Sequence, residues 1–270
     1  MKSILTILLA AVAALGAASA QNLAVAYTST ATSLTDGTTK NDIDYVLVAD
    51  GRRSMFYNPE KWTHDSIMST PGGKEAINRQ TLALIAAGKP LNSTPKGYYV
   101  VKRTGENIKT FYDEQERRLV EEPFEAIQWQ LTDSVKNILG YECRKASALY
   151  HGRNWTAWFS TEIPIQEGPW KLHGLPGLIL EAEADGGVYA FKATAVGLTD
   201  EAIPPIFGIN DFRPVDRIKY LRDKRDFTDH AMERLKSLHG SSFKIYNSDG
   251  SPCTVLYAPR TVIDFIETDY

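Results

Sequence analysis

Several motifs that mark enzyme or cofactor sites are missing from this chain of 270 residues. It has five histidines, and none of them stands in an H-x-x-x-H or H-E-x-x-H spacing. There is also no phosphate-binding P-loop, no G-x-G-x-x-G dinucleotide fingerprint and no G-x-S-x-G nucleophile elbow. The sequence therefore predicts no resident cofactor, assigns no metal ligand and names no catalytic residue.

Long hydrophobic runs are also scarce. The one apolar run, Ile4 to Leu15, is shorter than the roughly 20 residues that a membrane span needs. Lys2 precedes it and Ala18-Ser19-Ala20 follows it, which is the pattern of a signal peptide cleaved near Ala20. We expect residues 21–270 to be periplasmic or secreted, with no transmembrane span.

An excess of positive charge is absent as well. Residues 21–270 carry 29 basic and 33 acidic side chains, which gives a net charge of −4. Nucleic-acid binding calls for a concentrated basic surface, so this balance argues against a nucleic-acid partner.

Cysteine is limited to Cys143 and Cys253. In an oxidising compartment an isolated pair predicts a disulfide bond. The bond would close a loop of about 110 residues, worth up to ~4.7 kcal/mol in the chain-entropy model. The alternative is two free, buried thiols.

Turn signals recur about every ten residues between short segments rich in β-branched and aromatic side chains. Asp50-Gly51 and Asp185-Gly186 are two such signals, and both are typical of hairpins. This spacing indicates an all-β architecture, with neighbouring strands antiparallel. We predict a mainly β fold: a curved antiparallel meander sheet, half-barrel or barrel-like, with a few accessory helices. Curved sheets of this kind resemble the half-barrels of periplasmic lipid or lipoprotein carriers, as an analogy of fold only.

Two segments depart from the β pattern within one predicted domain, 21–270. The first is a helical insertion at about 59–96, with a helix near 74–87. The second is a tail at about 201–270, with helix-prone stretches at 214–224 and 226–238 and a final hairpin around Asp249-Gly250.

The centre of the chain is a glycine- and proline-rich corner, Gly168 to Gly177, that leads into the apolar strand Leu178–Leu180. Within it, Leu175-Pro176-Gly177-Leu178 fits a type II turn, because proline presets φ and glycine accepts a positive φ. The corner either fixes how one hairpin enters the sheet or presents Trp170 and His173 to a ligand or partner.

The hexapeptide from Gly174 to Ile179 resembles the signature of the GLPGLI family of secreted Gram-negative proteins. The segment from Gly140 to Ala146 resembles that family's Gly-Tyr-x-Cys-x-Lys-Ala element, and Trp155 to Pro164 resembles its tryptophan-bearing strand. Ser54-Met55-Phe56 is similar to an N-terminal Ser-x-Phe element, whereas the last third of the chain departs from the pattern. The resemblance implies an envelope location and a fold, but no substrate.

Tryptophans gather in the same region. Trp155 and Trp158 are three positions apart, so on a regular strand they point to opposite faces. One belongs in the core, and the other could line a groove for an apolar ligand, a sugar or a partner strand. The candidate binding residues are Trp155, Trp158, Trp170, His173, Gly174, Leu175, Pro176 and Gly177.

Three functions remain open. The first is a non-enzymatic envelope protein that binds an outer-membrane partner or an apolar ligand through the curved sheet. The second is a periplasmic hydrolase, because Glu181 and Glu183 share one strand face about 7 Å apart. The third is a metal-handling protein in which His151 and His173 meet across neighbouring strands and bind zinc together with a carboxylate.

Overall fold

A computed structural model describes residues 21–88, 95, 97–113, 116–240, 244–246, 250–260 and 263–270. The predicted signal peptide, residues 1–20, lies outside this part of the chain. Part of the expected helical insertion and the residues around Asp249 also lie outside it.

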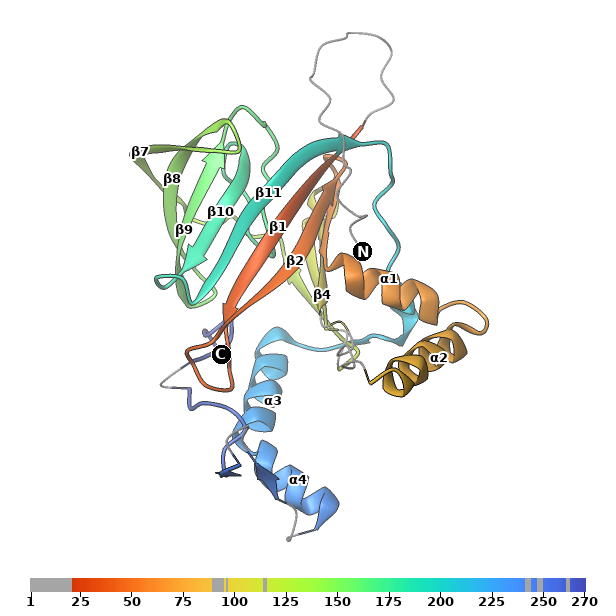
Figure 1. The fold of residues 1–270 in the computed structure, drawn as a ribbon. Helices are drawn as coiled ribbons and strands as arrows, with labels where there is room; N and C mark the ends of the chain where they lie inside the picture. Colours follow the sequence, from red (N-terminus) through yellow and green to blue (C-terminus); the bar gives the residue numbers. More distant parts are fainter. Residues whose placement is uncertain are drawn as a thin grey trace.

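One large curved sheet of twelve strands dominates the molecule (Figure 1). The strand order is β12-β6-β5-β4-β3-β2-β1-β11-β10-β9-β8-β7, and every neighbouring pair is antiparallel except β12 with β6. The strands are β1 (Asn22–Thr32), β2 (Lys40–Ala49), β3 (Arg53–Tyr57), β4 (Tyr98–Arg103), β5 (Ile108–Asp113), β6 (Arg118–Pro123), β7 (Gln130–Ile138), β8 (Tyr141–Tyr150), β9 (Arg153–Ser160), β10 (Leu178–Ala184), β11 (Tyr189–Thr199) and β12 (Arg213–Pro214).

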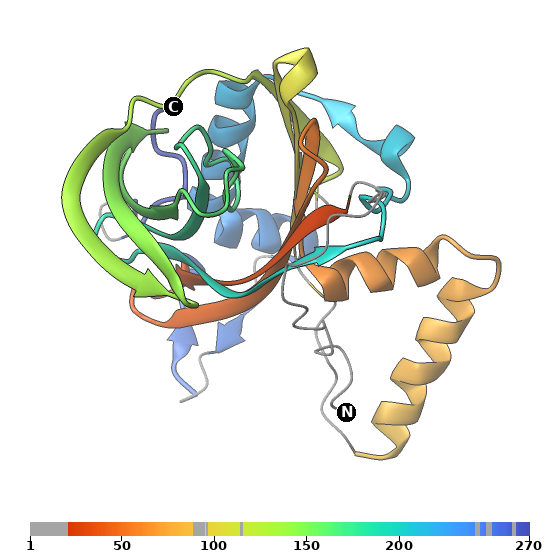
Figure 2. The ribbon, with the colours of Figure 1, turned by 90° about the horizontal axis from the view of Figure 1, so that it is seen from above.

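The sheet is two meanders joined side by side, β1–β6 and β7–β11. Long pairing between β1 and β11 joins them, and the edges β7 and β12 do not meet. The predicted mainly β, curved and antiparallel fold is therefore confirmed, in its open, half-barrel form (Figure 2). Sequence periodicity did not reveal the β1–β11 pairing, because that pairing joins segments about 170 residues apart.

Local sequence explains the hairpins. At the β2–β3 turn, the Asp50 carboxylate accepts hydrogen bonds from the backbone N–H groups of Arg52 and Arg53, and Gly51 takes a φ of +86°. On β9 the inward side chains of Trp155, Ala157 and Phe159 alternate with outward ones, as expected for a strand with one face in the core.

Four helices accompany the sheet in the described part of the chain: α1 (Pro59–Met68), α2 (Gly73–Ala86), α3 (Arg217–Asp229) and α4 (Ala231–His239). The insertion thus contains two helices where the sequence predicted one. The side chains of Asn58 and Asp216 cap α1 and α3 by accepting the N–H of the third helical residue. The pair α1–α2 projects to one side of the sheet in both views (Figures 1 and 2). None of the four described helices is long and apolar enough to cross a membrane.

Helix α3 packs against the sheet at β5 and β6. Tyr220 and Leu221 are buried against Val120, and the rings of Tyr220 and Phe111 lie 6.0 Å apart. The same cluster includes Tyr270, which brings the end of the chain to this helix.

The predicted disulfide does not form, and both cysteines are free. Cys143 is fully buried in β8, with its thiol 3.5 Å from the Tyr141 carbonyl. Cys253 lies in β14 (Pro252–Cys253), which pairs with β13 (Ile245–Tyr246) in a separate two-stranded sheet. The pairing inferred from compartment and count is therefore wrong for this structure, in which both thiols are free.

Candidate functional site

The segment between β9 and β10, residues 161–177, is called the corner loop below. It folds into the concavity formed by the curved strands (Figure 2). Trp170, Leu172 and Leu175 of this loop are each at most 1% exposed and belong to the main hydrophobic cluster. The loop therefore fills the concave face with its own side chains.

Two tryptophans form the centre of this packing. The rings of Trp155 and Trp170 are stacked with centroids 5.5 Å apart, and the Phe191 ring is also stacked with Trp155, at 6.1 Å. Trp170 adopts a φ of +52°, an uncommon conformation for a bulky residue. The strained backbone places the indole inward, where its burial offsets the conformational cost.

The turn at the end of the loop differs from the predicted type II turn. The N–H of Gly177 donates to the Leu175 carbonyl, which is a three-residue turn, and the N–H of Leu178 donates instead to Ile163. Glycine is required at 177 because a Cβ there would overlap the Ser160 carbonyl. The type II turn does not form because the carbonyl of Ile163, in another part of the corner loop, accepts the Leu178 N–H that would otherwise close that turn.

His173 is buried within the corner loop. Its ring nitrogens lie 2.9 Å from the Lys171 carbonyl and 3.0 Å from the Glu125 carbonyl, and its ring packs on Phe124. Burial, together with the nearby charge of Lys102, lowers the pKa of His173 to about 4. The imidazole is therefore neutral near neutral pH, and its single N–H can donate to only one of these two carbonyls.

The remaining candidate residues differ in exposure. Gly174 and Pro176 are exposed, whereas Leu175 is buried. Trp158 is half-buried on the face of β9 opposite Trp155, and Lys136 Nζ lies 4.4 Å from its ring centroid. A binding role for these residues stays a prediction, and for Trp155, Trp170, His173 and Leu175 the observed role is packing.

Lys171 of the corner loop is the centre of a buried ionic cluster. Its ammonium forms ion pairs with Glu122 and, at 2.7 Å, with Glu267. Burial alone would lower the pKa of Lys171 and raise that of Glu122, but their mutual attraction and that of Glu267 and His151 reverse both shifts. The pKa of Lys171 is therefore raised, and that of Glu122 lies well below its usual range.

Two further cations adjoin the same carboxylates. Arg217 donates to Glu267 at 2.9 Å, and Lys109 Nζ lies 3.9 Å from Glu122. Burial, with repulsion from Lys171, lowers the pKa of Lys109 to about 8 despite the attraction of Glu122. The Tyr150 hydroxyl accepts a 2.5 Å hydrogen bond from Lys109.

One group in this cluster has metal-ligand geometry. Potential ligand atoms of Glu122, His151 and Glu267 lie within 4.8 Å of one another. However, the Lys171 ammonium already bridges the two carboxylates, so a cation would have to compete with a fully buried lysine. His173 is not part of this group, so the structure does not assemble the predicted His151–His173 site.

The carboxylates proposed for hydrolysis, Glu181 and Glu183, lie on strand β10. Glu181 is paired with Lys136 and lies 3.8 Å from Lys192, and Glu183 is exposed. Both residues therefore lie on the outer, charged face of a strand whose other side chains are buried.

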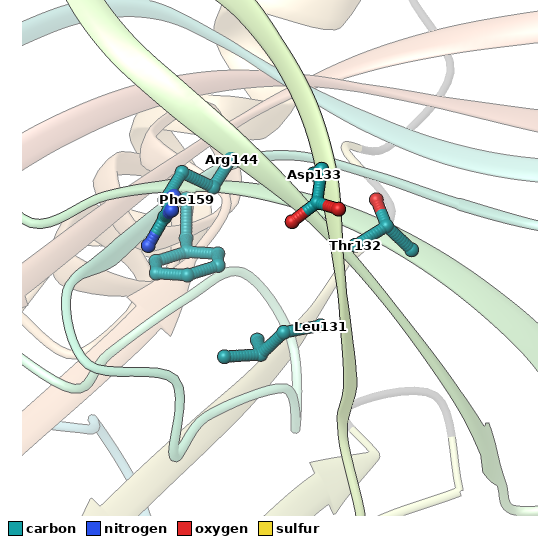
Figure 3. A pocket seen from close by; sticks show the side chains of 5 residues that line it. All are labelled: Leu131, Thr132, Asp133, Arg144 and Phe159. Atoms are coloured by element: carbon teal, nitrogen blue, oxygen red, sulfur yellow. The ribbon is translucent and has the colours of Figure 1, made fainter.

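A cavity of about 210 Å³ lies instead at the free edge of the sheet (Figure 3). The β7–β8 register shifts between Leu131 and Val135, which produces a bulge in β7 over the core residue Phe159. The cavity under this bulge is lined by Leu131, Thr132, Asp133, Arg144 and Phe159.

The cavity combines apolar and charged side chains. The guanidinium of Arg144 lies beside the ring of Phe159, while Asp133 and Leu131 approach from β7 (Figure 3). Around the cavity three large apolar side chains are exposed: Leu131 is 57% exposed, Val135 54% and Leu139 46%. Sequence reasoning missed this site, and the one signal was the interrupted alternation of β7.

A protein-family model matches the segment that contains the corner loop. A family described as a protein of unknown function, Porph_ging, matches residues 150–181, which run from the end of β8 into β10. No curated protein matches the chain.

Several solved structures are distantly similar. PNGF-II is 16% identical in one crystal form, with a TM-score of 0.48, covering 76% of this chain and 33% of that one. A LolA superfamily protein from Nitrosomonas europaea is 9% identical, with a TM-score of 0.25, covering 67% of this chain and 87% of that one. An uncharacterized conserved protein from Thermus thermophilus is 10% identical, with a TM-score of 0.37, covering 73% and 91% respectively. The chain thus spans about a third of the length of PNGF-II.

Proposed function

We propose that this chain is a non-enzymatic binding protein of the Gram-negative envelope, of GLPGLI type. It docks a mainly apolar, extended segment of a partner protein at the free edge of its curved sheet. The observation that carries the proposal is the bulged edge strand β7, with exposed Leu131 and Val135 beside the cavity at Arg144 and Phe159.

The filled concave face favours a docked partner over an enclosed apolar ligand. A carrier needs an apolar cavity for its cargo. Here Trp170, Leu172 and Leu175 occupy that position and are almost fully buried. Cargo could enter only if the corner loop left the core.

The edge supports docking in two ways. An edge strand has unpaired backbone groups that can pair with an added strand, and the cavity can take one of that strand's side chains. β7 pairs only with β8 among the described strands, and six of its nine residues in succession are exposed. The bulge limits indiscriminate pairing, so the cavity supplies the selectivity.

Position-specific crosslinking tests this proposal. A photoreactive amino acid placed at Val135 should crosslink one envelope protein in intact cells, and the same group at the exposed Lys192 on β11 should not. Leu131→Asp should abolish the crosslink at position 135 without altering the thermal unfolding midpoint, because Leu131 is exposed. Crosslinks to lipid alone, or equal protein crosslinks at both positions, would contradict the proposal.

A further inference from the structure

Residues 263–270, called the strap below, pack against a surface that binds their backbone. That surface is called the groove below, and it is formed by Arg153, Lys171, Tyr189, Arg217 and Arg225. Arg153 donates from Nε to the Phe265 carbonyl and from a terminal nitrogen to the Asp264 carbonyl, both at 2.9 Å. The Tyr189 hydroxyl donates to the Asp264 carbonyl, also at 2.9 Å. Hydrogen bonds to backbone carbonyl groups do not depend on the side chains of the bound segment. Arg153 and Tyr189 therefore bind the backbone of the strap whatever its side chains are.

The other end of the strap is held by the β8–β9 turn. The backbone N–H of Thr268 donates to the His151 carbonyl, and its hydroxyl donates to the Gly152 carbonyl, both at 3.0 Å. A Cβ on Gly152 would overlap the Thr268 side chain. The turn is therefore shaped to receive another segment of chain at this point.

The groove also binds three acidic side chains of the strap through ion pairs and hydrogen bonds. Arg225 pairs with Asp264. Glu267 accepts from Lys171 at 2.7 Å and from Arg217 at 2.9 Å. Asp269 receives both terminal nitrogens of Arg217, at 2.7 and 3.0 Å.

The strap and the groove carry opposite charges, and one aromatic ring of the strap packs on a cation of the groove. The strap contributes three carboxylates, and the groove contributes four cations: Arg153, Lys171, Arg217 and Arg225. The guanidinium of Arg225 also lies 4.4 Å from the centroid of the buried Phe265 ring. Arg153, Lys171 and Arg225 also pair with carboxylates outside the strap, namely Asp185, Glu122 and Asp229. Without the strap, this surface would therefore offer Arg217 and three partly neutralised cations, beside a place for one aromatic ring.

The described residues between helix α4 and the strap contact both the body and the strap: the Ala258 N–H donates to the Leu34 carbonyl, and Arg260 pairs with Asp264. Helix α4 ends at His239, and between it and the strap the strands β13 and β14 pair only with each other among the described residues. In the part of the chain that the structure describes, no strand of the twelve-stranded sheet lies beyond Pro214. The strap can therefore leave its groove without breaking a strand pair of the main sheet.

We propose that this groove is a second binding site, whose ligand is an extended acidic segment of a partner protein. That segment has carboxylates at relative positions 1, 4 and 6 and an aromatic residue at position 2. The strap is an intramolecular ligand that competes for the groove. The site is separate from the β7 edge, so it stands or falls independently of the function proposed above.

Peptide binding in trans tests this inference on the full-length chain. The probe is a fluorescein-labelled peptide with the sequence of residues 263–270, Ile-Asp-Phe-Ile-Glu-Thr-Asp-Tyr. Asp264→Asn in the chain weakens the strap and leaves the groove intact. The peptide should then bind the variant about tenfold more tightly than the original chain, because a larger fraction of grooves is open.

Matched controls locate the binding. Adding Arg217→Ala to the Asp264→Asn chain should abolish peptide binding. Adding Lys219→Ala, which removes an equal charge from the solvent side of the same helix, should leave it unchanged. A peptide with its three acidic residues changed to amides should not bind. If Asp264→Asn fails to fold, Asp269→Asn replaces it, since that carboxylate is 37% exposed.

Three results would overturn the inference. They are equal peptide affinity for the original and weakened chains, binding that survives Arg217→Ala, and dimers of the weakened chain in which each strap occupies the other copy's groove. Light scattering after size-exclusion chromatography detects the dimer, which would make a second copy the ligand in place of a separate partner.

Discussion

Lys171 Nζ lies 2.7 Å from Glu267 Oε1, which joins the corner loop to the strap across 96 positions of sequence. The same ammonium pairs with Glu122 at the end of β6, so one buried cation connects three distant segments. This contact links the packing of the concave face to the groove that holds the strap.

Replacing Lys171 by methionine should lower the free energy of unfolding by about 3–5 kcal/mol. The change leaves Glu122 and Glu267 buried without their shared cation, and a broken buried ion pair is costly. Urea unfolding measures the loss. Lys192→Met is the control: Lys192 is 70% exposed beside Glu181, and its replacement should cost less than about 1 kcal/mol. Equal losses would contradict a special role for the buried pair.

The two glycines of the central hexapeptide should respond differently to alanine. Gly174 has a φ of +87° and open space at its Cβ, so Gly174→Ala should cost about 1–2 kcal/mol of backbone strain. Gly177→Ala should cost clearly more, since the new methyl group meets the Ser160 carbonyl and one strand must shift. Thermal unfolding of the two variants compares them. A larger effect at position 174 would show that the close approach at Gly177 is absent in solution.

Acidification should weaken the fold through His173. Its pKa in the folded chain is lowered from 6.5 to about 4, so between these values the unfolded chain binds a proton that the folded chain does not. Stability should therefore fall as the pH drops from about 6.5 to about 4.

Ring carbon–proton NMR signals provide the site-specific measurement. His230 serves as the internal reference, because its hydrogen bond to Asp226 and the nearby carboxylate raise its pKa above 6.5. His173 should titrate well below His230. Titration of both residues above 6.5 would mean that His173 is not buried as described.

The two thiols should differ in reactivity. Burial raises the pKa of Cys143 to about 11, so a thiol reagent at neutral pH should label Cys253 and spare Cys143. Reductant should leave the thermal midpoint unchanged. Mass spectrometry of protein labelled in its folded, unreduced state measures the outcome, with Cys253→Ser as the control that removes labelling. If both cysteines resisted labelling even after denaturation without reductant, a disulfide between them would be present in solution.

Much of the architecture could be predicted because its signals are local. The Asp50-Gly51 turn and the alternation along β9 each depend on a few adjacent residues, and the structure follows them. Helix α1 of the insertion was missed because its apolar stripe is weak and only Lys61 and Asp65 of its residues are buried. The turn at Gly177 was assigned incorrectly because Ile163, a distant residue, accepts the decisive hydrogen bond.

The candidate sites were harder to predict than the fold. The tryptophans and His173 attracted attention by composition, but burial gives most of them a packing role. Arg144 and Lys171 carried no motif, and each matters through neighbours from other strands or loops. A charged residue inside a strand or loop looks solvated in sequence until packing encloses it.

By itself, the sequence determined the β-rich class, the hairpins and the presence of a tight corner before β10, since backbone preference and strand alternation act over short distances. Only the tertiary structure decided that the corner loop fills the concave face and that Cys143 and Cys253 lie in different sheets. It also placed Glu122, Lys171 and Glu267 together. These outcomes depend on which distant segments pack together, and a buried charge selects its partner through the free energy of desolvation, which no local pattern encodes.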